Sequence, residues 1–289
     1  MSDAGERLKA LLAKGCVTAP GAFDGLSVRL AAQAGFEAVY MTGFGVAGSL
    51  LGKPDIGLVS ASEMMERVCV LAEAASPALL IADGDNGHGG VLNVAELVRS
   101  YEASGAAAIQ IEDQVIPKRC GHMDGKELVP VAEAAAKIRA ACAARRSPHF
   151  QIIARTDARA VEGFEAALVR ARAYRKAGAD IIFVEAPRGI DELRAIVDAF
   201  PGVPLMANMV EDGKTPMLSA GQLAAMGYRL VIFPVSALLR AAQALADTYA
   251  EIRSEGRPHE EAPRFTFDGY NAALGLRELL AQAKKFEGE

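Results

Sequence analysis

Three carboxylates in the sequence have the spacing of a site for a hard cation. Asp83 and Asp85 are separated by one residue and follow the apolar run 78–81. In an extended chain, residues two apart point to the same side, so both carboxylates can face one ion. Glu112 follows the next apolar run, and Mg²⁺ favours a few carboxylates with water and substrate oxygens as its other ligands. We therefore expect Mg²⁺, with Mn²⁺ as a substitute; the alternative is that one aspartate only caps a helix.

A cysteine lies among groups that could make its thiol reactive. Cys120 follows Lys118 and Arg119, and Gly121 and His122 come directly after it. Positive charge and an imidazole beside a thiol lower its pKa, so that it can move a proton near neutral pH. The glycine and the polar residues after it indicate a mobile loop rather than the interior of a helix or strand. We therefore predict a catalytic thiol; a buried structural cysteine is the alternative.

Eight short apolar runs alternate with alanine-rich helical stretches and could hold these groups in place. Several helical stretches end at a glycine, which closes a helix in the left-handed conformation before the next strand begins. Runs without polar alternation are typical of parallel strands that helices cover on both faces. The runs are 17–19, 38–41, 78–81, 107–111, 152–154, 181–184, 203–206 and 230–233. This order predicts an α/β fold of the (β/α)₈ TIM-barrel type, with a doubly wound open sheet as the alternative.

Polar residues stand at the C-terminal ends of these runs. They are Thr42 and Gly43, Asp83 and Asp85, Glu112, Arg155, Glu185 and Asn208. In a parallel barrel all these ends meet on one face, where enzymes of this architecture build their active sites. One polar residue at a strand end could simply meet solvent. Six consecutive strand ends that carry Thr, acid, Arg or Asn favour a common site.

The composition is that of a globular chain with one domain. Of its 289 residues 51% are hydrophobic and 23% are charged, and no Pro/Gly/Ser-rich linker divides residues 1–289. A net charge of −5 disfavours nucleic-acid partners, which need a basic excess. No apolar run reaches the roughly 18 residues of a membrane span, so we expect no membrane association. The acidic N-terminus is unlike a secretory signal and the four cysteines are widely spaced, so we expect a cytoplasmic protein with reduced thiols.

Taken together, these motifs resemble the isocitrate lyase/phosphoenolpyruvate mutase superfamily. The run Lys118-Arg119-Cys120-Gly121-His122 is similar to the K-[KR]-C-G-H signature of its lyase branch. Asp83-Gly84-Asp85 resembles the paired aspartates on the metal side of the family site. Further matches are residues 111–114, 154–158, 184–186, 207–209 and 214–216, so the resemblance runs from about Pro20 to the last helix.

The resemblance implies a role for each matching residue. The implied ligands of Mg²⁺ are Asp85 and, partly through water, Asp83 and Glu112. The implied donors to the carboxylate of the pyruvyl or glyoxylyl half of the substrate are the N–H groups of Thr42, Gly43 and Phe44. The implied catalytic residues are Cys120 as general acid, Asp55, His122 and Arg155. Further implied substrate contacts are Gly121, Glu185, Asn208 and Thr215.

The resemblance also implies an assembly. Barrels of this family exchange their last helix between neighbours, so the implied partner is a second copy of the chain within a homotetramer. Residues 270–285 are the implied swapped helix, inside a C-terminal helical extension over residues 258–289.

The implied reaction breaks the C2–C3 bond of a small 2-hydroxy di- or tricarboxylate, similar to 2,3-dimethylmalate or 2-methylisocitrate. Its products would be pyruvate or glyoxylate and a second carboxylate, with Cys120 protonating C3 and the surrounding loop closing over the substrate. Phe44 and Val184 depart from the residues typical of methylisocitrate lyases, and Met123 replaces an Arg seen in some of them, which favours an alkylmalate. The alternatives are a phosphonomutase acting on carboxyphosphonoenolpyruvate or phosphoenolpyruvate, an oxaloacetate hydrolase, and a barrel that only binds a ligand.

Overall fold

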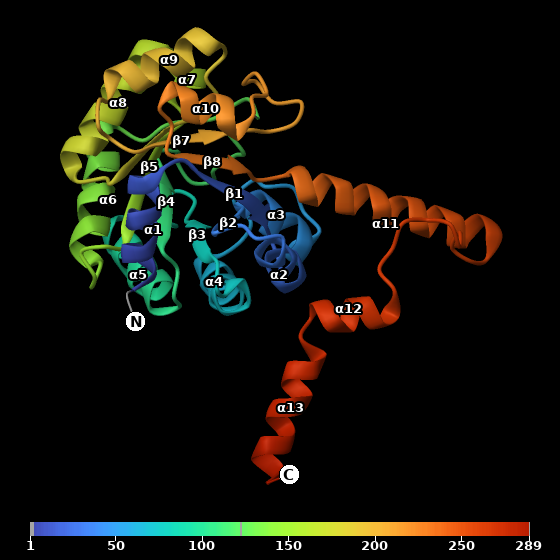
Figure 1. The fold of residues 1–289 in the computed structure, drawn as a ribbon. Helices are drawn as coiled ribbons and strands as arrows, with labels where there is room; N and C mark the ends of the chain where they lie inside the picture. Colours follow the sequence, from blue (N-terminus) through green and yellow to red (C-terminus); the bar gives the residue numbers. More distant parts are fainter. Residues whose placement is uncertain (1–2, 122, 289) are drawn as a thin grey trace.

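The computed structural model describes residues 3–121 and 123–288 and contains a closed barrel of eight parallel strands (Figure 1). The strands follow one another around the barrel in chain order, and the last pairs with the first to close it. Their bounds are β1 Val17–Ala22, β2 Ala38–Met41, β3 Leu79–Asp83, β4 Ala108–Glu112, β5 Gln151–Thr156, β6 Ile181–Val184, β7 Leu205–Asn208 and β8 Leu230–Phe233. The predicted (β/α)₈ barrel is therefore confirmed, and the open sheet is excluded.

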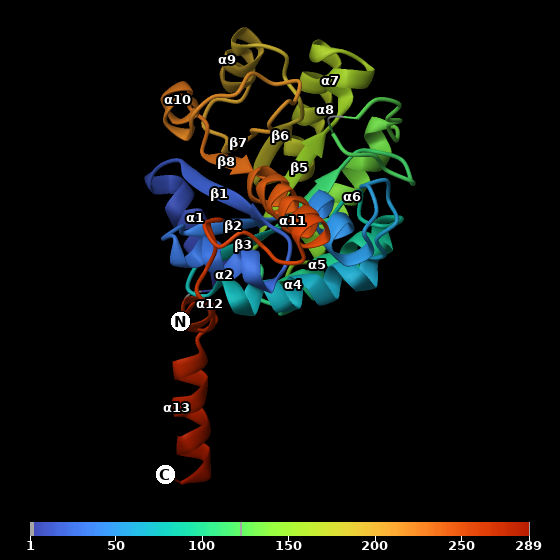
Figure 2. The same ribbon diagram turned by 90° about the vertical axis from the view of Figure 1, so that its right-hand side faces the viewer.

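Helices alternate with the strands, and most of those before residue 236 cover the outside of the barrel (Figure 2). They are α1 Ala4–Lys14, α2 Gly25–Gln33, α3 Gly43–Val46, the π-helical turn η1 Ala47–Leu51, α4 Ala61–Ala75, α5 Val91–Ala103, α6 Val131–Ala144, α7 Ala158–Val161, α8 Phe164–Ala177, α9 Ile190–Ala199, α10 Ala220–Met226, α11 Ser236–Glu255, α12 Phe267–Ala273 and α13 Leu276–Glu287. Gly178 and Gly227 close α8 and α10 with positive φ angles, as the glycine pattern predicts. No helix within the described residues is both long and apolar enough to cross a lipid bilayer.

Apolar side chains fill the barrel on both sides of its wall. Tyr40, Ile81 and Phe183 are buried inside the barrel, where Leu8 and Leu12 of α1 pack against the same cluster. A larger cluster lies between the strands and the surrounding helices. Because the strands are buried on both faces, their C-terminal ends form a rigid frame for the polar residues that follow.

The three helices at the C-terminus form an arm that leaves the barrel. Figure 1 shows α11 running outward, and Figures 1 and 2 both show α13 extending away from the rest of the molecule. No residue within these three helices is buried. The arm touches the barrel again where Arg29 and Gln33 of α2 donate hydrogen bonds to the carbonyl of Ala273.

The expected helix over residues 270–285 is in fact two helices. Gly275 lies between α12 and α13, and its φ of +79° interrupts the regular helix there. The expectation of one continuous helix is therefore wrong, whereas its exchange between subunits stays a prediction.

Candidate active site

The C-terminal ends of the strands converge on a cavity of about 300 Å³. The predicted site residues that line it are Thr42, Phe44, Asp55, Asp83, Cys120, Gly121, Arg155, Glu185 and Asn208. Others lie directly behind this lining and contact it: Gly43, Asp85 and Glu112. Thr215 is buried outside the lining, and His122 lies outside the described residues. The barrel thus brings most of the predicted residues together.

Several lining residues were not assigned to the site from the sequence. They are Tyr40, Lys118, Met123, Phe183, Val210, Glu211, Ile232, Pro234, Val235 and Leu239. Lys118 stands in the thiol motif and could have been found there. The apolar residues carry no such signal, because the same residue types also fill the core.

Asp83 ends β3 and Asp85 lies in the turn after it. The Asp83 carboxylate accepts hydrogen bonds from Gln110 Nε2 (3.1 Å), the Asp85 N–H (3.0 Å) and the Gly43 N–H (3.2 Å). Asp85 has a φ of +49°, so the argument that both residues point the same way along an extended chain is wrong. Both carboxylates still face Gly43, where a Cβ atom would lie 2.9 Å from Asp83 Oδ2 and 3.1 Å from Asp85 Oδ1. Burial, and then the charge of Asp85, raises the pKa of Asp83 to about 6.

The ammonium group of Lys118 joins two loops beside this pair. Its Nζ lies 2.6 Å from Asp55 Oδ1 and 2.6 Å from Asp85 Oδ1. Burial opposes the charged form, but the charges of Asp85 and Asp55 hold the pKa of Lys118 well above its usual value. Burial also raises the pKa of Asp55. Lys118 therefore forms ion pairs with these two carboxylates, whereas we had expected its charge to act on the thiol of Cys120.

The predicted metal ligands are carboxylates, which suit a hard divalent cation, but the three side chains do not lie close enough together to form a complete metal site. Among residues 3–121 and 123–288, no three His, Cys, Asp or Glu side chains are close enough together to hold a metal ion. Glu112 is buried with its Oε1 atom free of hydrogen bonds, and this burial raises its pKa well above the usual value. Mg²⁺ commonly binds through one or two carboxylates and completes its shell with water and substrate. Asp83, Asp85 and Glu112 fit that mode of binding.

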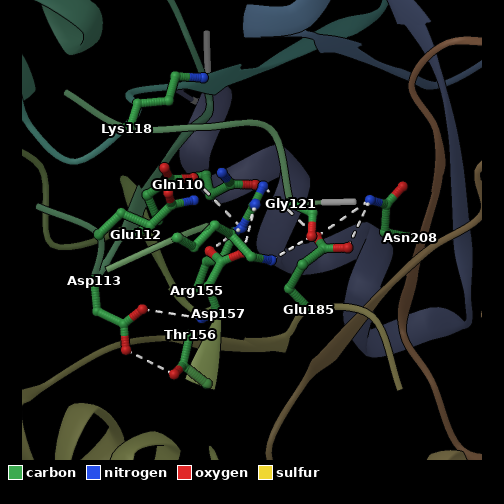
Figure 3. A network of polar contacts seen from close by, with 12 residues as sticks. Gln110, Glu112, Asp113, Lys118, Gly121, Arg155, Thr156, Asp157, Glu185 and Asn208 are labelled. Atoms are coloured by element: carbon green, nitrogen blue, oxygen red, sulfur yellow. Dashed lines mark hydrogen bonds and ion pairs between the residues drawn. The ribbon is translucent and has the colours of Figure 1, made fainter. Parts of the chain in front are cut away.

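Arg155 lies at the centre of a buried ion-pair network (Figure 3). Its Nε and Nη2 atoms donate to the Asp157 carboxylate at 2.9 and 3.1 Å. It also lies 3.4 Å from Glu112 Oε2 and 3.6 Å from Glu185 Oε2, with its guanidinium 5.4 Å from the centre of the Phe183 ring. Burial works against ionisation of Asp157, yet the charges of Arg155 and Lys126 hold the pKa of this carboxyl well below its usual range. Paired donors of this kind fix the guanidinium plane of Arg155.

Glu185 and Asn208 continue the network across the cavity. The Nδ2 group of Asn208 donates to both carboxylate oxygens of Glu185, at 3.3 and 3.2 Å. Figure 3 shows Glu185 between Arg155 and Asn208. The Oδ1 atom of Asn208 is buried without a hydrogen-bond partner, so it can accept a hydrogen bond from a ligand.

The residues around the thiol pack closely against this network. The N–H of Cys120 donates to the Asp55 carbonyl at 3.3 Å. Gly121 lies against Arg155 and Glu185, where a Cβ atom would contact Arg155 Nη2 and would lie 2.8 Å from Glu185 Cγ and Cδ. Only glycine allows the backbone to approach so closely. The thiol residue is therefore held in the lining of the cavity that contains Arg155.

Thr42 and the two residues after it form the start of the short helix α3. The Thr42 side chain accepts a hydrogen bond from the Gly45 N–H at 3.4 Å, and the Gly43 N–H already donates to Asp83. Of the three predicted carboxylate donors, Thr42 and Phe44 line the cavity.

Comparison with known families and proteins agrees with this architecture over most of the chain. Residues 8–253 match the family described as phosphoenolpyruvate phosphomutase. The chain is 43% identical to 2,3-dimethylmalate lyase of Eubacterium barkeri over 280 residues, which cover 96% of each chain. It is 44% identical to 2-methylisocitrate lyase of Bacillus subtilis (strain 168) over 257 residues, 89% of this chain and 84% of the relative.

Solved structures give the same picture. A crystal structure of 2,3-dimethylmalate lyase superimposes with a TM-score of 0.94 at 38% identity, covering 98% of this chain and 96% of that one. Oxaloacetate acetylhydrolase with the inhibitor 3,3-difluorooxalacetate also reaches 0.94, at 35% identity and coverage of 99% and 97%. A phosphonopyruvate hydrolase complex with oxalate and Mg²⁺ reaches 0.86, at 35% identity and coverage of 97% and 98%.

Proposed function

Since the chain belongs to the phosphoenolpyruvate mutase/isocitrate lyase superfamily, we propose that it is a Mg²⁺-dependent carbon–carbon lyase acting on a small 2-hydroxy dicarboxylate. The reaction would break the C2–C3 bond and release pyruvate or glyoxylate and a second carboxylate. One observation carries the proposal. A single cavity contains the thiol of Cys120, the guanidinium of Arg155 and Asp83 of the carboxylate set.

Breaking the C2–C3 bond requires a Lewis acid and a base. The C2–C3 electron pair passes to C3, while the C2 hydroxyl loses its proton and becomes a carbonyl. Mg²⁺, held by Asp85, Asp83 and Glu112, would supply a Lewis acid for the negative charge on the C2 oxygen. A nearby carboxylate must take the hydroxyl proton, and we assign this role to Asp55, which lines the cavity.

The second half of the reaction needs a cation and an acid. The carbanion at C3 survives as the enediolate of its own carboxylate, which the guanidinium of Arg155 can face from the cavity wall. Cys120 would then transfer its proton to C3. The segment around Cys120 would close over the substrate, because an exposed enediolate would be protonated by water.

The charges of the cavity favour a dicarboxylate over a tricarboxylate. Among the described residues that line it, the cations are Lys118 and Arg155, and each already pairs with two or more carboxylates. A third substrate carboxylate would need a further cation. Apolar side chains of Phe44, Val235 and Leu239 also line the cavity and suit alkyl groups on the substrate. These features support a 2,3-dimethylmalate-like substrate over a 2-methylisocitrate-like one.

Two other reactions on the same site remain as alternatives. The close superposition with oxaloacetate acetylhydrolase favours hydrolysis of oxaloacetate as the second candidate. A phosphonomutase reaction on carboxyphosphonoenolpyruvate or phosphoenolpyruvate is the third candidate. A structure named phosphoenolpyruvate phosphomutase superimposes at 30% identity. Hydrolysis of oxaloacetate also leaves a carbanion that needs a proton, whereas the phosphonomutase reaction does not require a proton from Cys120.

A substrate panel tests the proposal. The enzyme is incubated with Mg²⁺ and, separately, 2,3-dimethylmalate, 2-methylisocitrate, oxaloacetate and phosphonopyruvate, and products are identified by mass spectrometry. We expect pyruvate and propionate from 2,3-dimethylmalate, with slower release of pyruvate and succinate from 2-methylisocitrate. Turnover of oxaloacetate or phosphonopyruvate alone would overturn the lyase assignment.

We further propose that the chain forms a homotetramer in the cytoplasm. Exposed apolar residues recur along the arm: Leu245, Tyr249, Ile252, Leu279, Leu280 and Phe286. Such a surface is costly in water, and a second copy of the chain could cover it by exchange of the arm. The four cysteines are free thiols, which agrees with a reducing compartment.

A further inference from the structure

Lys126 is a buried lysine whose ammonium connects the thiol segment to the barrel. We define the thiol segment as residues 114–121 and 123–128. The side chain of Lys126 is 1% exposed. Its Nζ donates to the main-chain carbonyl of Gly121 and, at 2.8 Å, to Asp157 Oδ1. A buried ammonium is costly unless it is paired, so both contacts are needed to keep it there.

The carboxylate that receives Lys126 is the one that orients Arg155. Asp157 Oδ1 accepts from Lys126 and from Arg155 Nη2, and Oδ2 accepts from Arg155 Nε. The Asp157 carboxylate therefore positions two groups: the Arg155 guanidinium in the cavity and, through Lys126, the carbonyl of Gly121 next to the thiol residue.

Asp157 is itself fixed from behind. Its N–H donates to Asp113 Oδ1 at 2.9 Å, as Figure 3 shows. The other oxygen of Asp113 accepts from the hydroxyls of Thr156 (2.6 Å) and Tyr174 (2.7 Å). Asp113 directly follows β4, Tyr174 lies in α8, and both are buried, so the anchor for Lys126 belongs to the rigid wall of the barrel.

Two other side-chain contacts of the thiol segment involve neither Arg155 nor Asp157. Arg119 donates to the Asp124 carbonyl within the segment, and Lys118 ties the segment to Asp55 in a neighbouring loop. Neither contact relates the thiol residue to Arg155. Gly121 lies directly against Arg155, and Lys126 fixes the Gly121 carbonyl relative to Asp157 through its two hydrogen bonds.

We propose that Lys126 is a positioning residue, which holds Cys120 at a fixed place relative to Arg155 by way of the Gly121 carbonyl and Asp157. The proposal rests on the proposed function in assuming that Cys120 and Arg155 act on one substrate. Lys126 itself touches neither the substrate nor the reacting atoms.

The test compares Lys126→Met with Lys137→Met. Lys137 is a matched control, since it is also buried and donates to a loop carbonyl, that of Asn86 at 3.0 Å. The first readout needs no substrate: the rate at which iodoacetamide alkylates Cys120, followed by mass spectrometry of its peptide. We expect Lys126→Met to raise this rate about tenfold, the effect of losing a charge-assisted hydrogen bond, and Lys137→Met to leave it unchanged. The second readout is kcat, expected to fall by about 10²-fold, with KM changing much less, because about 1 Å of misplacement has that effect.

The outcomes separate this proposal from the proposed function. If the wild type cleaves no 2-hydroxy acid but alkylation of Cys120 responds to Lys126→Met, the lyase assignment fails and the positioning role stands. If the wild type is an active lyase and neither readout responds, Lys126 has no positioning role. Should Lys126→Met fail to fold, Lys126→Gln keeps a donor for the Gly121 carbonyl without the charge and is measured in the same way. If neither variant folds, Lys126 is a structural residue and the proposal is overturned.

Discussion

A methyl group added at Gly121 tests whether the thiol segment must lie against the Arg155 network. In the structure the added Cβ would contact Arg155 Nη2 and lie 2.8 Å from Glu185 Cγ and Cδ. Carbon atoms in ordinary contact are roughly 3.5–4.0 Å apart, so the segment or Glu185 must move by roughly 1 Å. A displacement of that size near reacting groups can cost about 10²-fold in rate. We therefore expect Gly121→Ala to lower kcat by about 10²-fold while the protein remains folded.

The matched control is Gly189→Ala. Gly189 precedes α9 with a φ of −167°, and a Cβ there would meet nothing within 4 Å. Both variants are compared with wild type by steady-state turnover of 2,3-dimethylmalate and by thermal unfolding. Equal kcat in Gly121→Ala and Gly189→Ala would refute the close packing that we assign to Gly121.

Three further perturbations follow from the structure. Exhaustive EDTA treatment is expected to abolish turnover, which Mg²⁺ or Mn²⁺ but not Zn²⁺ restores; full turnover in EDTA would contradict the carboxylate metal site. Asp157→Asn is expected to cost about 3–5 kcal/mol of unfolding free energy at pH 7 in urea titrations, because it leaves Arg155 and Lys126 buried with less counter-charge. The pKa of Asp157 is lower in the folded than in the unfolded protein, where it is about 4, so this carboxylate stabilises the fold above that pH and stops doing so as the pH falls below it. The unfolding free energies of wild type and Asp157→Asn should therefore converge in acid. A difference in unfolding free energy that does not change with pH would be inconsistent with this ion pair. Light scattering is expected to give a tetramer, and deletion of residues 256–289 a smaller species; a monomeric wild type at micromolar concentration would count against arm exchange.

The fold was largely predictable because its signal is repeated eight times along the chain. Strands β2, β6 and β8 have the predicted bounds. Strands β3, β4, β5 and β7 continue past their apolar runs to Asp83, Glu112, Thr156 and Asn208, since backbone pairing in a sheet does not depend on whether the side chain is polar. The split of the last helix at Gly275 was missed, although a glycine within a helical pattern is itself a signal of a break.

The site was predictable in its membership and much less so in its contacts. Strand ends in a parallel barrel must converge, so Asp83, Arg155 and Asn208 could be placed together without knowing any distance. The ion-pair partners of charged residues could not be predicted in this way, because Lys118 pairs with Asp55 and Asp85, which come from segments far apart in the chain. Spacing along the sequence carries no information about such pairs. For the same reason the connection between Lys126 and Asp157 is visible only in the folded molecule.

The role of Cys120 as the acid that protonates C3 is tested most directly by Cys120→Ser. Serine has nearly the same size but is a far weaker acid, so it cannot deliver the proton at neutral pH. The measurement is kcat for 2,3-dimethylmalate cleavage, with Mg²⁺ binding and thermal unfolding followed in parallel and Cys142→Ser, half-buried on α6, as the control. We predict a loss of about 10²–10⁴-fold for Cys120→Ser, with Mg²⁺ binding retained, and little change for Cys142→Ser. Retention of more than about a tenth of wild-type turnover by Cys120→Ser, a loss below the lower end of that range, would contradict the thiol-acid mechanism.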